Sequence, residues 1–501
     1  MAVRAPDLPS DAVWLNVERP LEAEDLTGRV VLLDFWTFSS IDSIQGLPVL
    51  AAIEWELEGE PFVVIGVHSP KFPYERDPDV VREALRRYGV THPVVIDSDH
   101  AAWNRFGVTT WPTRALIDAQ WFLIGGNSGR PDPGDLLGTV REVLNRPRSG
   151  TLPHRETLPI RPVTKPPGSL AYPSKVIVGS RGKLVIVADT GHDQVVVADA
   201  HGREILRIGS GRSGLADGPF HQARFHRPNG LALAGETLYI ADTGNHAIRA
   251  ADLRGRSVAT VAGTGSPGAG AASGRVPGRE AALSSPWDLT WDATRSLLYA
   301  AMAGSHQLWS FDPTHGTIEA FAGTGQEGGA DGPAQEASLA QPSGVALMEG
   351  VLYVADSQIS SIRSISPRGE DLWVRTLCGS RELLGFGDHD GTGEEALLQH
   401  PMGITAGDGV LYVADSFNHK VKRVDPTSGE CATLFGNGEI ERLEEFPAGH
   451  QLKPVDSGTP AFFEPQGLAC RDGELLVADT NNHRVVSVRL VGGERRVFMG
   501  G

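Results

Sequence analysis

The stretch Val30-Val31-Leu32-Leu33-Asp34-Phe35-Trp36-Thr37-Phe38-Ser39-Ser40-Ile41-Asp42-Ser43 decides how the first part of this chain folds. Its apolar run predicts a buried strand, and a helical pattern follows over Ser43–Leu57. Ser40 and Ser43 occupy the ends of a slot with C-x-x-C spacing, but the slot carries no sulfur. A serine hydroxyl neither attacks a disulfide nor resolves a mixed disulfide. We therefore do not expect the chain as given to catalyse dithiol exchange.

Strand and helix patterns alternate through residues 1–147, which indicates an α/β domain. The predicted strands are Val30–Phe35, Phe62–His68, Val94–Asp97, Thr113–Ile117 and Gln120–Gly126. The predicted helices are Ser43–Leu57, with a kink at Pro48, then Pro78–Tyr88, His100–Phe106 and Pro133–Asn145.

Five landmarks in this domain resemble the thioredoxin fold. Asp34 matches a buried acid, Ser40 and Ser43 match the nucleophilic and resolving cysteines, and Pro48 matches the helix kink. The fifth landmark, Trp111-Pro112-Thr113, matches the loop that faces the redox loop. The resemblance implies a cis Trp111–Pro112 bond and a groove that holds extended polypeptide.

The groove that this resemblance implies would be lined by Trp36, Ser39, Ser40, Asp42, Ser43, Trp111, Pro112 and Thr113. The loop residues also have a purely structural interpretation. Ser40 would cap the following helix, and Asp42 would favour its positive N-terminus. Asp34 would then be an internal carboxylate held by hydrogen bonds.

Residues 148–170 are rich in proline and lack periodicity, which predicts a linker, with Thr157–Val163 as a candidate edge strand. After the linker, a unit of roughly 60 residues recurs six times. Each unit opens at a proline, and the six are Pro173, Pro228, Pro286, Pro342, Pro401 and Pro465. An apolar strand ending in Ala-Asp follows in five units, at Asp189, Asp242, Asp356, Asp415 and Asp479, whereas the third unit has Met302.

Short strands in a repeating unit predict a six-bladed β-propeller over residues 171–501. The units resemble NHL repeats, and the domain order resembles the NHL-repeat-containing protein 2 family. That family carries Cys-Cys-Ile-Asn-Cys where this chain has Ser39-Ser40-Ile41-Asp42-Ser43. The fold class is therefore a two-domain chain, with an α/β thioredoxin-like fold followed by an all-β propeller.

Three features of the repeats have competing interpretations. G-x-G-x-x-G recurs at Gly209, Gly263 and Gly323, where we expect inter-blade loops and not dinucleotide sites. A histidine recurs after the Ala-Asp strand, and this pattern fits either a structural turn or a ring of metal ligands. The histidines are His246, His306, His419 and His483, and the other two units have Asp193 and Ser360 at this position. The third unit also carries Trp287, Asp288 and Trp309 at repeat positions, which indicates either an exposed apolar patch for a partner or simple repeat drift.

Composition narrows the classes of function. The formal net charge of −17 argues against a nucleic-acid partner, and no apolar stretch reaches the roughly 18 residues of a membrane span. The N-terminus shows no secretory h-region. Cys378, Cys431 and Cys470 are expected to be small buried residues, which favours a reducing, cytoplasmic compartment. We expect neither cofactor nor metal.

These observations lead to a redox-inactive binding or scaffold module for a protein or peptide, with a small ligand at the propeller channel as an additional candidate. The first alternative is a thiol–disulfide oxidoreductase, which requires that natural cysteines stand at positions 39, 40 and 43. The second alternative is a metal-dependent propeller hydrolase or lyase, which requires a carboxylate or histidine cluster at the channel mouth.

Overall fold

The structure is a computed structural model that describes residues 3–9, 11–146, 157–164, 168–179, 182–268, 274–442 and 448–500. The chain divides into two compact units, Met1–Pro166 and Pro167–Gly501. The predicted linker, residues 148–170, lies in large part outside the described residues. Its candidate edge strand is described: Ile160 bridges Val17 in antiparallel fashion, and the N–H of Glu18 donates to Pro159.

The first unit is built on a seven-stranded mixed sheet in the order β1-β7-β6-β3-β4-β5-β2. Its strands are β1 (Val3–Arg4), β2 (Trp14–Leu15), β3 (Val30–Trp36), β4 (Phe62–His68), β5 (Val94–Ile96), β6 (Thr113–Ile117) and β7 (Phe122–Ser128). Strands β3, β4 and β5 are parallel, and the other pairs are antiparallel. The central strand β3 is buried along its whole length, as its apolar sequence predicts.

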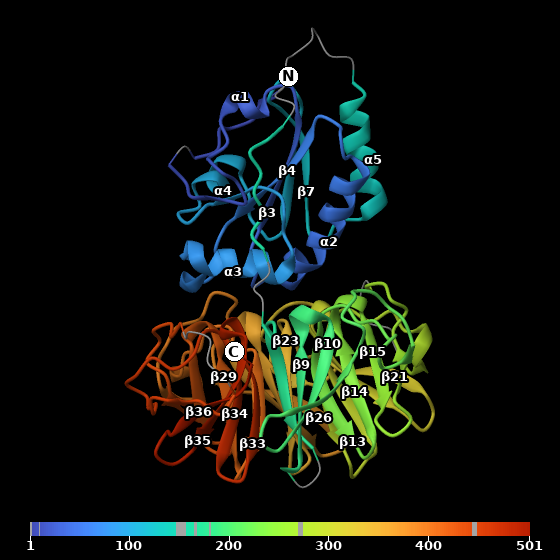
Figure 1. The fold of residues 1–501 in the computed structure, drawn as a ribbon, viewed down its shortest axis with the longest axis vertical. Coiled ribbons are helices and arrows are strands. Elements are labelled where there is room, and N and C mark those ends of the chain that lie inside the picture. The colour runs from blue at the N-terminus through green and yellow to red at the C-terminus, as the bar shows by residue number, and fades with distance from the viewer. Residues whose placement is uncertain are drawn as a thin grey trace. The chain divides into compact units, whose positions relative to one another are not determined.

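Helices cover both faces of this sheet (Figure 1). They are α1 (Ala23–Leu26), α2 (Ile41–Glu56), α3 (Pro78–Tyr88), α4 (Ala101–Phe106) and α5 (Pro133–Leu144), with a 3₁₀ turn, η1 (Pro73–Arg76). One core joins α2 and α5 to the face that carries Val30 and Leu32. The other core joins α1 and α4 to the face that carries Val31 and Leu33. Alternation along β3 thus supplies both cores.

The second unit is a six-bladed propeller of antiparallel sheets (Figure 1). Blade one contains β8 (Pro173–Val178), β9 (Leu184–Asp189), β10 (Gln194–Asp199) and β11 (Glu204–Ile208). Blade two contains β12 (Gly218–Pro219), β13 (Pro228–Ala234), β14 (Thr237–Asp242), β15 (Ala247–Asp252) and β16 (Ser257–Ala262). Blade three contains β17 (Val276–Pro277), β18 (Pro286–Asp292), β19 (Leu297–Met302), β20 (Gln307–Asp312) and β21 (Thr317–Ala322). Blade four contains β22 (Gly332–Pro333), β23 (Pro342–Met348), β24 (Val351–Asp356), β25 (Ser361–Arg368) and β26 (Asp371–Gly379). Blade five contains β27 (Gly391–Thr392), β28 (Gly403–Gly407), β29 (Val410–Asp415), β30 (Lys420–Val424) and β31 (Glu430–Phe435). Blade six contains β32 (Gln451–Leu452), β33 (Pro465–Arg471), β34 (Glu474–Asp479), β35 (Arg484–Arg489) and β36 (Arg495–Gly500).

One polar contact is repeated at every blade junction. The residue at the histidine position of each blade has a positive φ, and its side chain accepts a hydrogen bond from the backbone N–H just before the opening proline of the next blade. The six pairs are Arg227 to Asp193 (2.7 Å), Ser285 to His246 (3.0 Å), Gln341 to His306 (3.0 Å), His400 to Ser360 (3.1 Å), Glu464 to His419 (3.2 Å) and Tyr172 to His483 (3.2 Å). The histidines therefore accept through Nδ1 and hold neighbouring blades together, which supports their structural interpretation.

The glycine motifs also take the structural role that we expected. Gly209, Gly263 and Gly323 each follow the last strand of a blade in chain order, β11, β16 and β21, and none of them opens a helix. All three have a positive φ. An ideal Cβ on Gly263 would lie 2.4 Å from the His246 carbonyl oxygen, so the sharp turn needs glycine.

The third blade departs from the others in its interior. Met302, Trp309 and Trp287 are all buried, at 0, 2 and 7 % exposure. The idea that this blade presents them as an exposed apolar patch is therefore wrong. Trp309 and Met302 instead join the core between blades two and three, where they replace the buried ion pairs of other blades.

Candidate functional site

The serine loop of the first unit is closed on itself. Ser40 is the N-cap of α2, and its hydroxyl accepts from the Ser43 backbone N–H at 3.4 Å. The Ser43 hydroxyl in turn accepts from the Thr37 N–H at 3.4 Å. Both serines are more than nine-tenths buried. The capping interpretation of Ser40 is thus confirmed, because its hydroxyl satisfies a free N–H of the first helical turn.

A buried glutamate holds the other half of this loop. Glu75, at the end of η1, accepts from the Thr37 hydroxyl and from the Ser39 N–H (3.1 Å). Its second oxygen accepts from the N–H groups of Lys71 (2.8 Å) and Phe72 (2.9 Å). Burial raises the pKa of Glu75, and these hydrogen bonds oppose the shift. Sequence reasoning missed Glu75, although the Pro73-Tyr74-Glu75 order is typical of a short capped helix.

Asp34 lies beneath the loop, opposite Arg114 of β6. Its Oδ1 is 3.6 Å from Arg114 Nη1, and both side chains are almost fully buried. Burial raises the pKa of Asp34 to about 6, against the opposing charges of Arg114 and His92. Arg114 is held elsewhere, because its Nε donates to Asn127 Oδ1 at 3.0 Å. Asp34 is thus an internal carboxylate as expected, but among the described residues its Oδ1 has no hydrogen-bond partner, so the nearby Arg114 cation and not a hydrogen bond balances it.

An aromatic cluster forms where β3 and β4 end, at the paired residues Trp36 and His68. The His68 ring stacks on Phe38 with centroids 5.4 Å apart and meets the edge of Trp36 at 5.2 Å. Burial lowers the pKa of His68 to about 3. Among the described residues, neither His68 ring nitrogen nor Trp36 Nε1 has a hydrogen-bond partner. Trp36 is fully buried, so it offers no surface to a partner, contrary to the expectation that it lines the groove.

The second loop of the expected groove leaves the same edge of the sheet. β3 pairs with β6 so that Phe35 lies opposite Thr113, which brings residues 36–40 and 109–112 to neighbouring positions. The Trp111–Pro112 bond is cis, as the resemblance implied. Trp111 donates from Nε1 to the Ser69 carbonyl at 2.8 Å and packs on Trp103 at 4.5 Å.

The expected groove residues differ in accessibility. Trp36, Ser39, Ser40, Ser43 and Pro112 are buried. Trp111 and Thr113 are partly exposed, and the Asp42 side chain is 35 % exposed beside Arg130 (3.6 Å). Surface contacts with a partner are thus open to Asp42, Trp111 and Thr113 only, of the eight.

The propeller channel is crossed by a buried ion pair. Lys175 of blade one and Asp288 of blade three occupy positions where the other blades have glycine, and Lys175 Nζ lies 2.6 Å from Asp288 Oδ2. Asp288 Oδ2 also accepts from the Val345 N–H at 3.0 Å. The space around this pair is about 10 Å³, close to that of a single water. The channel is therefore closed at this level.

On one side of the ion pair the channel widens. A cavity of about 320 Å³ has Lys175 at its end and is lined by the inner strands of all six blades. Its wall includes Trp291, Thr290, Thr405 and Cys470. This volume falls in the range of small-molecule sites.

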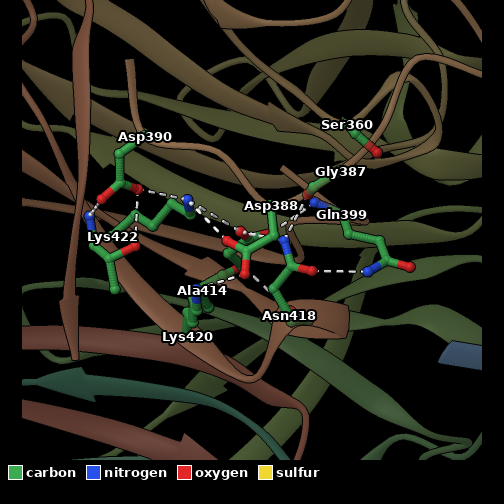
Figure 2. A network of polar contacts seen from close by, with 12 residues as sticks. Ser360, Gly387, Asp388, Asp390, Gln399, Ala414, Asn418, Lys420 and Lys422 are labelled. Carbon is green, nitrogen blue, oxygen red and sulfur yellow. Dashed lines mark hydrogen bonds and ion pairs between the residues drawn. The ribbon is translucent and has the colours of Figure 1, made fainter. Parts of the chain in front are cut away.

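In several blades a buried cation pairs with an aspartate of the loop that precedes the first strand of the blade. Figure 2 shows the network in blade five, where Lys422 Nζ contacts Asp390 (2.9 Å) and Asp388 (3.4 Å), and Lys420 contacts Asp388 (2.5 Å). Lys422 also lies 3.9 Å from the repeated Asp415. Arg249 and Arg363 make equivalent pairs in blades two and four. Within the described residues, no group of three His, Cys, Asp or Glu side chains forms a metal-binding cluster.

Comparisons with known proteins place the chain in a family. The family model NHL repeat matches residues 462–486. The NHL repeat-containing protein 2 of Homo sapiens is 36 % identical over 517 residues, covering 96 % of this chain and 69 % of the human protein. This chain belongs to the NHL repeat-containing protein 2 family. Both units of the chain lie within that match.

Two further relatives match all or part of the chain. Protein SUPPRESSOR OF QUENCHING 1, chloroplastic, of Arabidopsis thaliana is 38 % identical over 518 residues, covering 98 % of this chain and 47 % of the plant protein. The chain thus spans about half of that relative's length. Thiol-disulfide oxidoreductase YkuV of Bacillus subtilis is 28 % identical over 127 residues, covering 24 % of this chain and 84 % of YkuV. The first unit is therefore thioredoxin-like. Among the described residues, no helix is both long and apolar enough to cross a membrane.

Proposed function

We propose that this member of the NHL repeat-containing protein 2 family is a redox-inactive binding module, and that its thioredoxin-like unit docks an extended polypeptide against Trp111. The observation that carries the proposal is the contrast between the two loops. The hydroxyls of Ser40 and Ser43 accept bonds within their own loop. In the part of the chain that the structure describes, the backbone N–H and C=O of Trp111 make no hydrogen bond.

Trp111 lies in the loop before β6, and unpaired backbone N–H and C=O groups can pair with an extended strand, as they do at a sheet edge. The indole of Trp111, held by Ser69 and Trp103, adds a rigid apolar surface beside these groups. Asp42, in the first turn of α2, favours a peptide with a basic residue close to the paired segment. The expected partner is thus an extended peptide with apolar and basic side chains.

The test is peptide binding by the full chain, with hits from a peptide array measured by fluorescence polarisation. We expect Trp111→Ala to weaken binding at least tenfold and Trp111→Phe to retain most of it. Trp55→Ala is the matched control, because Trp55 is 73 % exposed on α2. Methylating the peptide nitrogen that pairs with residue 111 should also weaken binding. Binding unaffected by both changes would refute the proposal.

The propeller cavity supports a second candidate, a small ligand at one mouth of the channel. The 320 Å³ cavity ends at the Lys175–Asp288 pair, so a ligand enters and leaves by the same side. Saturation-transfer NMR with a fragment library would test it. Ala406→Trp, in the cavity wall, should abolish the signal of any fragment bound there.

The oxidoreductase alternative depends on the natural gene. Cysteine codons at 39, 40 and 43 would revive it, whereas the chain as given should reduce insulin no faster than buffer. For compartment we propose the cytoplasm, supported by the three free cysteines, a state that reducing surroundings maintain. Fractionation of the source cells tests this.

A further inference from the structure

The propeller holds a pair of thiols that the sequence does not reveal. Cys378 lies on β26 of blade four and Cys431 on β31 of blade five, both fully buried. They belong to one core cluster, which is formed by residues of both blades. The Cys431 thiol raises the pKa of the Cys378 thiol, an effect that depends on the two side chains being close neighbours.

The backbones around the two cysteines are also close. An ideal Cβ on Gly429, two residues before Cys431, would lie 2.5 Å from the carbonyl oxygen of Leu377, the neighbour of Cys378. The two strands therefore touch where the cysteines lie. The chain contains only three cysteines, and Cys470 belongs to a different core cluster, between blades five and six.

We propose that Cys378 and Cys431 form a peroxide-sensitive dithiol that closes into a disulfide between blades four and five. One sulfur, as thiolate, attacks hydrogen peroxide; the O–O bond breaks, and a sulfenic acid and one water result. The second sulfur attacks the sulfenic sulfur, its S–O bond breaks, and a second water leaves. Two thiols are oxidised to one disulfide, and one peroxide is reduced to two waters.

The surroundings control when this reaction occurs. The closed core excludes oxidant, and the partner thiol together with burial raises the pKa of Cys378, which disfavours its thiolate. The ammonium of Lys422 is the positive charge that acts on both sulfurs. When the blade junction opens locally, Lys422 stabilises the thiolate that reacts. Oxidation then ties the two blades across the junction.

The experiment uses the full chain treated with hydrogen peroxide, then denatured in N-ethylmaleimide and weighed by mass spectrometry. We expect one alkylated thiol in place of three, recovery of all three with dithiothreitol, and a linked peptide carrying Cys378 and Cys431. Cys378→Ser and Cys431→Ser, checked for folding by circular dichroism, should lose the linked species. The matched control, Cys470→Ser, should keep it.

Three results would overturn the proposal. One is three alkylatable thiols after peroxide treatment, including treatment in urea just below the unfolding transition, where junctions open. The second is a disulfide that contains Cys470. The third is sulfinic acid at Cys378 or Cys431 without any disulfide. Cys378→Ala serves as a second variant if the serine variant fails to fold.

Discussion

The backbone N–H of Tyr172 donates to Nδ1 of His483, 311 positions later in the chain, at 3.2 Å. This bond joins the last blade to the first. The rings of the two residues also meet edge to face at 4.4 Å, and the Thr480 hydroxyl donates to the Pro173 carbonyl at 2.8 Å. Each blade of this propeller keeps its own strands, so side-chain contacts of this kind close the ring.

Replacing His483 tests this closure. His483→Ala removes the acceptor and places alanine at a positive φ, so we expect a loss of about 1–3 kcal/mol in the free energy of unfolding. His483→Asn should cost less, because asparagine tolerates this φ and offers an acceptor, as Asp193 does in blade one. Hydrogen exchange of peptides from blades one and six measures the effect. Equal protection of these peptides in the unchanged chain and in His483→Ala would show that the bond does not hold the ring.

The ion pair across the channel makes a second prediction. Lys175→Met leaves Asp288 buried without its cation, and we expect a loss of about 3–5 kcal/mol. The double variant Lys175→Met/Asp288→Asn should be more stable than Lys175→Met alone, because the uncompensated charge is gone. Urea unfolding checks this, with the exposed Lys183→Met as control. A double variant that loses the sum of both single losses would show that the pair is not coupled.

The third blade tests why the repeated aspartate needs a cation. Met302→Asp restores the repeat residue but places a carboxylate beside Trp309, so we expect a loss of about 3 kcal/mol or more. Adding Trp309→Arg should recover part of that loss, because it supplies the cation that Arg249 provides for Asp242 in blade two. Thermal unfolding of the two variants gives the comparison. Met302→Asp with unchanged stability would mean that water or another group compensates the charge.

Asp34 predicts a pH dependence of the first unit. Because burial raises its pKa from 3.8 to about 6, the folded state binds a proton that the unfolded chain has already released. This favours the folded state below about pH 4, and the benefit is lost as the pH rises through about 6, with a limit of roughly 3 kcal/mol. Asp34→Asn should lack this component. The measurement is hydrogen exchange of β3 peptides at pH 4 to 7 in the unchanged chain and in Asp34→Asn. Parallel pH profiles of the two proteins would show that the prediction is wrong.

Local sequence patterns predicted most of the elements. The strands Phe62–His68 and Thr113–Ile117 and the helix Pro78–Tyr88 end where they were expected. The predicted helix Ser43–Leu57 begins two residues earlier, at Ile41, because Ser40 and not a later residue caps it. Short edge strands such as β1 and β2 were not predicted, since two residues carry too little periodicity.

The candidate site could be predicted only in part. The serine slot, Asp34 and the Trp111-Pro112 loop are visible because they lie in recognisable motifs. Glu75 was missed because its partners Thr37 and Ser39 lie more than thirty positions away. The burial of Trp36 was likewise not foreseen, because accessibility depends on what packs above a residue.

The order of residues alone determined the α/β unit, the six repeats and the absence of sulfur at positions 40 and 43, because each depends on local pattern or chemical identity. Tertiary structure decided which repeat residues meet: Lys175 with Asp288, Cys378 with Cys431, and His483 with Tyr172. These residues lie far apart in the sequence, and they meet only when neighbouring blades pack together and the ring closes.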